Sequence, residues 1–267
     1  MRKIKQHTLQ KLKYFEKYLN AYLLATKKLP KKYFIDAFAG TGKCIVNNSG
    51  NEVNNSGNEV DGSAMIALKA KNSFNGYLLI ENKKGNIVEL KSKIEKEIPT
   101  ERKLAAKVLH EDCNEYLKDL YKSIYPYSGY LIFLDPEGPE LFWETIRCLS
   151  KINKADLLIL YPYDMSLVRL TKNFKDKLDK FYGTGDWRKI YSERKTPLDS
   201  KQGLLNFYMD NLKNIGFKHT TCRQIRTGFR NGKSLYHLIL ASRSPIASKI
   251  MSQIFDKELD GQRKLSI

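Results

Sequence analysis

A glycine-rich turn that follows a buried strand is the sharpest chemical motif of this 267-residue chain. The stretch Ile35-Asp36-Ala37-Phe38-Ala39-Gly40-Thr41-Gly42 runs out of an apolar segment into that turn. In open parallel sheets, ligands bind beyond the carboxyl ends of the strands, where glycines let a ligand come close to the backbone. The motif therefore predicts a ligand site at the end of the first strand.

Three ligands compete for this turn. A nucleoside triphosphate needs G-x-x-x-x-G-K-[ST], but Ala37 stands at the first glycine and Cys44 at the last position. A dinucleotide needs G-x-G-x-x-G, and Ile45 replaces the third glycine. S-adenosylmethionine carries no phosphate and needs a carboxylate for its amino group, which Asp36 could contact directly or through water. The turn therefore favours S-adenosylmethionine, held by the following residues: Asp36, Ala37, Phe38, Ala39, Gly40 and Gly42.

Two further acids close the next two predicted strands. Glu81, followed by Asn82, ends the second strand, where a carboxylate can accept both ribose hydroxyls. Asp112 ends the third, where a carboxylate can accept from the adenine amine while Cys113 packs on the ring. A single acid after a strand is commonly a solvated or helix-capping residue. Three acids at three successive strand ends favour a cofactor site.

The fourth predicted strand ends in Asp135-Pro136-Glu137-Gly138. N-methyltransferases carry Asp/Asn-Pro-Pro-aromatic at this position, because a carboxylate and a carbonyl that accept the two amino hydrogens make a nucleobase amine more nucleophilic. Asp135 and Pro136 fit this role and are the expected catalytic residues, although a strand-terminating turn is the alternative. Glu137 and Gly138 do not match, so an aromatic partner must come from elsewhere, with these candidates: Phe142, Trp143, Tyr161 and Tyr163.

The elements that position these residues alternate between apolar strands and amphipathic helices. Helices are expected at 7–27, 63–70, 82–98, 114–124 and 141–152, and strands at 32–38, 77–81, 105–112, 130–135 and 156–161. Residues 165–216 read as helical, a hairpin is expected from strands 218–226 and 235–242, and a last helix at 245–258. This alternation predicts a parallel sheet with helices on both faces.

We expect four segments along the chain. They are a basic N-terminal helix (1–30), a cofactor-binding α/β core (31–164), a helical insertion (165–216), and a hairpin and helix (217–267) that complete the core. Residues 47–53 are repeated as 54–60, and this small, polar duplicate predicts a flexible surface loop beside the glycine turn.

Positive charge is concentrated at the two flanks. Residues 1–32 hold ten Lys/Arg and one acid, residues 33–168 hold sixteen and nineteen, and residues 169–233 hold sixteen and six. Basic flanks around a slightly acidic middle favour nucleic acid, DNA or RNA, as a partner, and a solvated surface is the alternative. Membrane-spanning and signal segments are not expected, so we expect a cytoplasmic protein.

A metal site is not expected from the cysteine and histidine spacing. The four cysteines, at 44, 113, 148 and 222, form no C-x-x-C pair, and the four histidines are equally scattered. Reduced, mostly buried thiols are the prediction.

The chain resembles the three-Cys-motif partner proteins, a group similar to class I S-adenosylmethionine-dependent methyltransferases. The resemblance rests on these stretches: His7-Thr8, Lys11-Leu12, Tyr18-Leu19, Ala21-Tyr22, Tyr33–Gly42, Gly62-Ser63, Ala67-Leu68, Leu134–Gly138, Tyr182-Gly183 with Trp187, and Tyr236–Arg243. The duplicated loop, Ala64 in place of a frequent proline and Glu137 in place of a frequent aromatic depart from the family. The resemblance implies a Rossmann-like α/β fold whose seven-stranded, mostly parallel sheet has an antiparallel last strand beside the sixth.

These observations predict an S-adenosylmethionine-dependent methyltransferase that modifies an amino nitrogen of a nucleic-acid base. Two alternatives stay open. The chain could be a non-catalytic, methyltransferase-like subunit that binds nucleic acid or a partner protein encoded nearby, or its acceptor could be a protein or small molecule.

Overall fold

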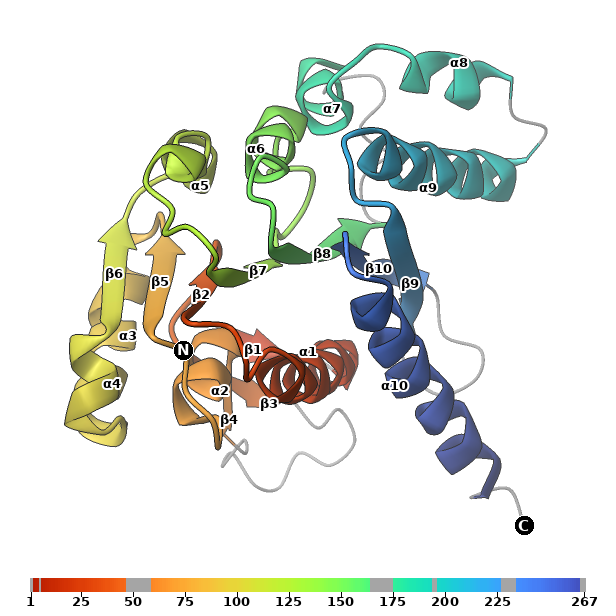
Figure 1. The fold of residues 1–267 in the computed structure, drawn as a ribbon. Coiled ribbons are helices and arrows are strands. Elements are labelled where there is room, and N and C mark those ends of the chain that lie inside the picture. The colour runs from red at the N-terminus through yellow and green to blue at the C-terminus, as the bar shows by residue number, and fades with distance from the viewer. Residues whose placement is uncertain are drawn as a thin grey trace. The chain divides into compact units, whose positions relative to one another are not determined.

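The computed structural model describes residues 2–4, 6–46, 59–163, 175–193, 196–226 and 234–264 (Figure 1). By its internal contacts the chain divides into two compact units. The first contains residues 1–113, 126–133 and 250–267, and the second contains residues 114–125 and 134–249. The four segments expected from the sequence stay a prediction, and residues 165–174 of the expected insertion lie outside the described part of the chain.

The first unit holds parallel strands with helices packed on them. Its strands are β2 (Lys32–Asp36), β5 (Gly76–Glu81), β6 (Ala106–His110) and most of β7 (Gly129–Leu134). Its helices are α1 (Gln6–Ala25), α2 (Ser63–Lys69), α3 (Lys84–Glu97), α4 (Thr100–Leu104) and the end of α10 (Pro245–Lys264). β2 pairs in parallel with β5 and with β7, and β5 pairs in parallel with β6. Asp36 lies opposite both Leu79 and Phe133, so the register places the end of β2 between its neighbours.

Helix α1 forms because apolar side chains recur on one of its faces, and that face is buried. Phe15 packs against Phe34 of β2 and Phe133 of β7, with ring centroids 5.7 and 4.5 Å apart. Tyr14 meets Phe255 of α10 edge to face at 5.2 Å. The helix therefore packs on β2 and β7, and the helix predicted at 7–27 is confirmed.

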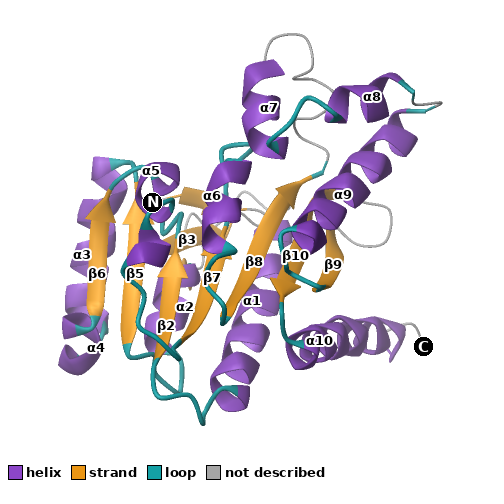
Figure 2. Cartoon of the chain, turned by 45° about the horizontal axis from the view of Figure 1, so that its top comes forward, coloured by secondary structure: helices purple, strands orange, loops and turns teal. Residues whose placement is uncertain are grey.

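The second unit contains β8 (Ala155–Pro162), β9 (His219–Arg226) and β10 (Ser234–Ser242). Its helices are α5 (Cys113–Leu117, all but its first residue), η1 (Leu120–Lys122), α6 (Trp143–Leu149), α7 (Lys175–Tyr182), α8 (Trp187–Ser192) and α9 (Pro197–Asn214). β10 runs antiparallel to both β8 and β9. The three strands lie side by side in the order β8, β10, β9 (Figure 2). The hairpin predicted near residues 218–242 is confirmed, and its turn, 227–233, lies outside the described residues.

The strand order of the seven-stranded sheet is β6-β5-β2-β7-β8-β10-β9, with β10 as the antiparallel strand between β8 and β9. This order confirms the predicted Rossmann-like fold of class I methyltransferases, including the last strand inserted beside the sixth. Parallel strands covered on both faces are apolar throughout, and every residue of β7 is buried.

A small second sheet was not predicted. β1 (Arg2–Ile4) pairs in parallel with β3 (Lys43–Val46), which pairs antiparallel with β4 (Glu59–Asp61). The prediction of a surface loop at 47–60 is wrong for its last two residues, since Glu59 and Val60 form part of β4. The rest of the duplicate, 47–58, lies outside the described residues.

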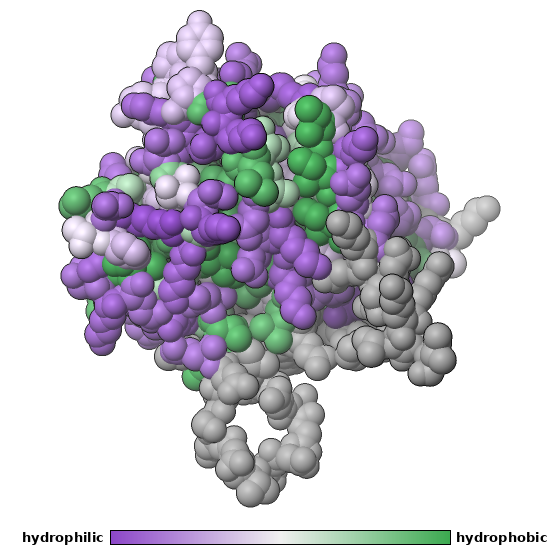
Figure 3. Space-filling view, turned by 60° about the horizontal axis from the view of Figure 1, so that its bottom comes forward, coloured by the Kyte–Doolittle hydropathy of each residue, from purple (hydrophilic) through white to green (hydrophobic). Residues whose placement is uncertain are grey.

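The visible face in Figure 3 is mainly hydrophilic, with smaller areas of apolar side chains. No described helix is long and apolar enough to span a membrane.

His237, in the middle of β10, makes the fold sensitive to acid. Its side chain is 7% exposed, its ring packs on Tyr163 at 4.3 Å, and its Nδ1 has no hydrogen-bond partner among the described residues. Burial lowers the pKa of His237 from 6.5 to about 4. The unfolded chain binds this proton at higher pH than the folded chain, so stability falls as pH falls from about 6.5 toward 4.

We predict that His237→Phe removes this acid sensitivity. Between pH 7 and pH 5, wild type should lose about 2 kcal/mol of unfolding free energy more than the variant does. Urea unfolding at the two pH values measures the difference, and His219→Phe on β9 is the control. Equal losses in wild type and His237→Phe would contradict the assignment.

Candidate active site

The glycine turn after β2 is held by the backbones of both neighbouring strands. The Ala37 N–H donates to the Phe133 carbonyl of β7 at 3.1 Å, and the Ala39 N–H donates to the Ile80 carbonyl of β5 at 2.9 Å. Ala37 and Ala39 are buried, whereas Phe38 and Gly40 are partly exposed. The turn is therefore fixed at its base and presents its tip to the surroundings.

Glu81, the last residue of β5, fixes the tip of that turn. Its Oε2 accepts from the Gly40 N–H at 2.9 Å, and its Oε1 accepts from the Lys83 N–H at 2.8 Å. The side chain is 8% exposed. Each carboxylate oxygen can accept two hydrogen bonds, so one acceptor position on each oxygen remains beside these backbone bonds. The strand-end acid predicted to bind a ribose is thus also a structural part of the turn.

Asp36 is fully buried beneath the turn. Its Oδ1 accepts from the Phe38 N–H at 3.1 Å, and its Oδ2 accepts from the hydroxyl of Ser63, the first residue of α2, at 2.6 Å. A buried carboxylate needs such donors, because an unsatisfied buried charge is costly. Asp36 therefore joins β2, the turn and α2, and it lies below the surface a ligand would touch.

The two glycines of the turn differ in what surrounds them. Both have a positive φ, +60° at Gly40 and +79° at Gly42. A Cβ at Gly42 would lie 2.8 Å from Leu90 Cδ1 and 3.2 Å from Met65 Cγ, whereas no described atom lies within 4 Å of a Cβ at Gly40. Gly42 is a packing position, and Gly40 faces open space where a ligand can approach the backbone.

A network of ion pairs holds the strands that follow the turn. Lys43 bonds Glu59 at 3.0 Å and Glu97 at 2.7 Å, while Lys69 bonds Glu97 at 2.7 Å and Asp61 at 2.9 Å. The ammonium group of Lys43, followed by that of Lys69, lowers the pKa of Glu97. Burial lowers the pKa of Lys69, but Glu97 and Asp61 outweigh it and leave that pKa raised. The network ties β3 and β4 to α2 and α3.

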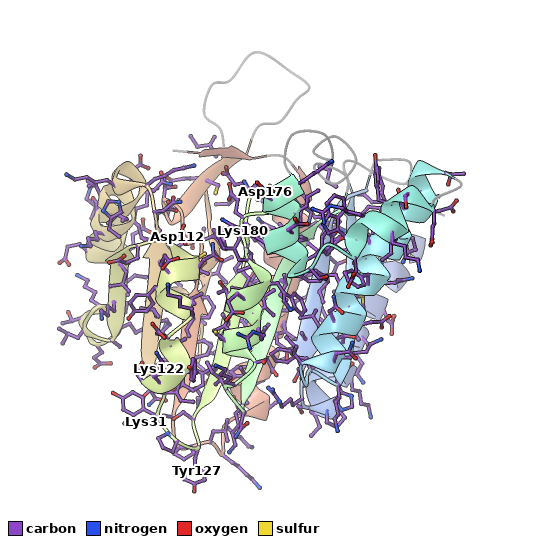
Figure 4. The ribbon with its side chains drawn as sticks, turned by 90° about the horizontal axis from the view of Figure 1, so that it is seen from above. Lys31, Asp112, Lys122, Tyr127, Asp176 and Lys180 are labelled. Carbon is purple, nitrogen blue, oxygen red and sulfur yellow. The ribbon has the colours of Figure 1, made fainter. Side chains whose placement is uncertain are left out.

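The third strand end differs from the prediction. β6 ends at His110 rather than at Asp112, because its pairing with β5 stops where His110 lies opposite Glu81. The His110 Nε2 lies 3.1 Å from the Asn82 carbonyl oxygen. Asp112 is exposed beyond the strand, before α5 (Figure 4), Cys113 is buried, and Asn82 is exposed. All ten predicted cofactor residues lie in the first unit, because that unit includes residues 1–113.

Asp135 and Pro136 begin the segment that joins β7 to α6 in the second unit. Asp135 is half-buried, Pro136 is buried and Glu137 is exposed. Burial distinguishes the four candidate aromatic residues. Tyr161 and Tyr163 are buried, and Phe142 and Trp143 are partly exposed.

Lys180 of α7 (Figure 4) places its ammonium group 5.3 Å from the centre of the Phe142 ring. Trp143 instead meets Tyr208 of α9 edge to face at 5.4 Å. The hydroxyls of Tyr161 and Tyr182 share a buried 2.8 Å hydrogen bond, and burial is the main cause that raises the pKa of both tyrosines. Phe142 is thus the partly exposed aromatic nearest in sequence to Asp135 and Pro136.

Sequence reasoning missed Ser63 and the backbone of Lys83. Ser63 follows Gly62 at a helix start, a usual place for a hydroxyl donor, but its pairing with Asp36 joins residues 27 positions apart. Among the described residues, no group of three or more His, Cys, Asp or Glu could hold a metal ion.

Comparisons with known proteins identify the fold. No protein-family model and no curated protein sequence match the chain, so the resemblance to three-Cys-motif partner proteins stays a prediction. The structure is similar to that of LPL1258 from Legionella pneumophila, of family model DUF519. The two share 15% identity, the match covers 92% of this chain and 90% of that chain, and the TM-score is 0.56. At that identity the likeness shows the fold alone.

Two further solved structures cover most of the chain at lower similarity. An rRNA methylase from Streptococcus thermophilus has 10% identity, covering 86% of this chain and 94% of that one, with a TM-score of 0.42. SMU.1697c from Streptococcus mutans, solved with SAH (S-adenosylhomocysteine), has 10% identity over 85% and 94%, with a TM-score of 0.41. Scores this low carry no argument about this chain.

The surroundings of the two glycines predict that alanine destabilises the fold to different extents at positions 40 and 42. Gly40→Ala should lower the free energy of unfolding by about 1–2 kcal/mol, because alanine is strained in the left-handed backbone conformation. Gly42→Ala should cost about 2–4 kcal/mol, because the methyl group also collides with Leu90 and Met65. Denaturant unfolding of both variants measures the two losses of free energy. A loss in Gly40→Ala equal to or larger than that in Gly42→Ala would contradict the open space assigned beside Gly40.

Proposed function

We propose that this chain is an S-adenosylmethionine-dependent methyltransferase. The observation that carries the proposal is the pairing of an open Gly40 with the Glu81 carboxylate that holds it. A glycine cradle beside a strand-end acid fits a nucleoside whose ribose hydroxyls donate to a carboxylate. The residues present therefore fit the cofactor, which supplies an electrophilic methyl group when bound.

Each predicted cofactor residue has a distinct role in this proposal. Glu81 accepts from the ribose hydroxyls with its remaining acceptor positions, and exposed Asp112 accepts from the adenine amine. Asp36 is fully buried, so it acts on the methionine amino group through its negative charge or through a water molecule. Gly40 lets the ligand lie against the backbone, and Cys113 packs beneath the ring.

Asp135 and Pro136 are the proposed acceptor residues. The Asp135 carboxylate and the backbone carbonyl at Pro136 accept the hydrogens of an amino nitrogen and orient its lone pair toward the methyl carbon. When bound, S-adenosylmethionine would supply the electrophilic methyl carbon toward which these two groups would direct the nitrogen lone pair. The Asp135 carboxylate would accept the proton that the methylated nitrogen loses.

A nucleic-acid base is the acceptor we favour, in DNA or RNA. The exposed side of α1 and the turn after it present five lysines and one acid: Lys13, Lys17, Lys27, Lys28, Lys31 and Glu16. Such a surface attracts phosphates without reading sequence, and a base acted on by an enzyme is flipped or single-stranded.

The second candidate function is that of a non-catalytic, methyltransferase-like subunit. Such a subunit would bind either nucleic acid or a partner protein encoded nearby. The contact of Lys180 with the Phe142 ring favours it, because a base could stack on that face only if the lysine moved away. Cofactor binding without turnover on nucleic acid would support this candidate.

Two variants should separate cofactor binding from methyl transfer. Glu81→Gln should weaken S-adenosylmethionine binding about tenfold or more, because a hydrogen bond to a charged group contributes about 1.5–3 kcal/mol. Asp135→Ala should keep cofactor affinity and lower transfer to RNA or DNA about a hundredfold. Calorimetry and transfer of a tritiated methyl group measure the two effects.

Glu111→Gln, an exposed acid next to Asp112, is the matched control and should bind the cofactor as wild type does. Absence of cofactor binding by the wild-type protein would overturn the proposal. Loss of cofactor affinity in Asp135→Ala would make Asp135 a cofactor residue instead.

The basic surface makes a prediction about salt. The triple variant Lys13→Gln/Lys27→Gln/Lys28→Gln should reduce the slope of log Kd against log salt concentration by about 2–3 for mixed-sequence RNA or DNA. Fluorescence anisotropy at several salt concentrations measures the slope.

The control replaces three exposed lysines of α3, Lys84, Lys91 and Lys96, and should leave the slope unchanged. Equal slopes for wild type and the α1 variant would remove α1 from the interface. Absence of nucleic-acid binding at low salt would favour a protein or small-molecule acceptor.

A further inference from the structure

Asn114, in the second unit, makes three hydrogen bonds to one short stretch of chain. Its Nδ2 donates to the Glu140 carbonyl, and its Oδ1 accepts from the Phe142 N–H and from the Thr145 hydroxyl, all at 2.9 Å. The side chain is 6% exposed. Two of the three bonds are to backbone groups, so Asn114 fixes the path of the chain as well as a side chain.

The stretch held by Asn114 is the end of the segment that starts with Asp135 and Pro136. This segment runs from the end of β7 to the start of α6 at Trp143. Phe142 precedes α6 as its N-cap residue, and its own side chain makes no capping hydrogen bond in the described structure. Asn114, from another element, binds the backbone N–H of this N-cap residue, and together with the Thr145 hydroxyl this bond uses both acceptor positions of Oδ1.

The chemistry of these bonds requires an amide. Aspartate could accept from Phe142 and Thr145, but it could not donate to Glu140 and would place a charge against that carbonyl oxygen. Alanine would remove all three bonds and leave buried polar groups without their partner. The segment would then be held at the end of β7, but it would lose its anchor at the start of α6.

We propose that Asn114 is a positioning residue that fixes the 135–142 segment, and through it the acceptor groups of Asp135 and Pro136. This inference rests on the proposed function. A residue that orients reacting groups affects the chemical step, because a displacement of about 1 Å at the reacting atoms costs about a hundredfold in rate. Asn114 touches neither acceptor nor cofactor in this account and acts only through the segment.

The experiment compares Asn114→Ala and Asn114→Asp with wild type. Both variants should bind S-adenosylmethionine within about twofold of wild type and lower kcat at saturating RNA or DNA at least about tenfold. Thr145→Val removes one of the three bonds and should lower kcat less. A fall in cofactor affinity equal to the fall in kcat would overturn the inference.

Trp143 gives a second measurement that does not depend on activity. The chain has two tryptophans, so Trp187→Phe leaves Trp143 as the reporter next to Phe142. In that background, Asn114→Ala and Asn114→Asp should increase acrylamide quenching of Trp143, and the matched variant of an exposed asparagine, Asn153→Ala, should not. Unchanged quenching in folded Asn114 variants would overturn the inference.

Failure of this inference differs from failure of the proposed function. If wild type transfers no methyl group to any acceptor, the proposed function fails, and Trp143 quenching alone decides whether Asn114 fixes the segment. If the Asn114 variants do not fold, Thr145→Val decides, with greater quenching than wild type expected and equal quenching contradicting the inference.

Discussion

The candidate cofactor site depends on one carboxylate that accepts two backbone N–H groups. Glu81 bonds Gly40 across 41 positions of sequence and Lys83 across two, so the end of β5 fixes both the glycine turn and its own exit toward α3. Asp36 performs the same task below, where it binds Phe38 and Ser63. Acids that look like free ligands in the sequence thus first satisfy the backbone, and a ligand uses the acceptor positions that remain.

The strands and helices of the sheet could be predicted because their apolar residues are long, regular signals. Buried β7 and β8 and amphipathic α1 lie within a few residues of their expected bounds. The small sheet of β1, β3 and β4 could not be predicted, because strands of three or four residues are too short to show a hydrophobic periodicity. β6 ends two residues before the predicted Asp112, because Glu111 and Asp112 do not pair with β5.

The residue types of the site could be predicted, but their partners could not. A strand-end acid is visible in sequence at Asp36 and Glu81, whereas the Ser63 hydroxyl and the Gly40 N–H join them only through tertiary structure. Asn114 gave no signal at all, because its three bonds connect it to residues 26 to 31 positions away. Hydrogen bonds between distant segments depend on the packing of whole elements, which a local pattern does not specify.

Hydrogen exchange with and without S-adenosylmethionine tests whether the cofactor binds at the glycine turn, because it locates a ligand at individual backbone segments. We expect slower exchange in residues 37–43 and 81–83 when the cofactor is bound, with the middle of α3 unchanged as an internal reference. Saturating cofactor that leaves both segments unprotected, or that protects only segments elsewhere, would contradict it.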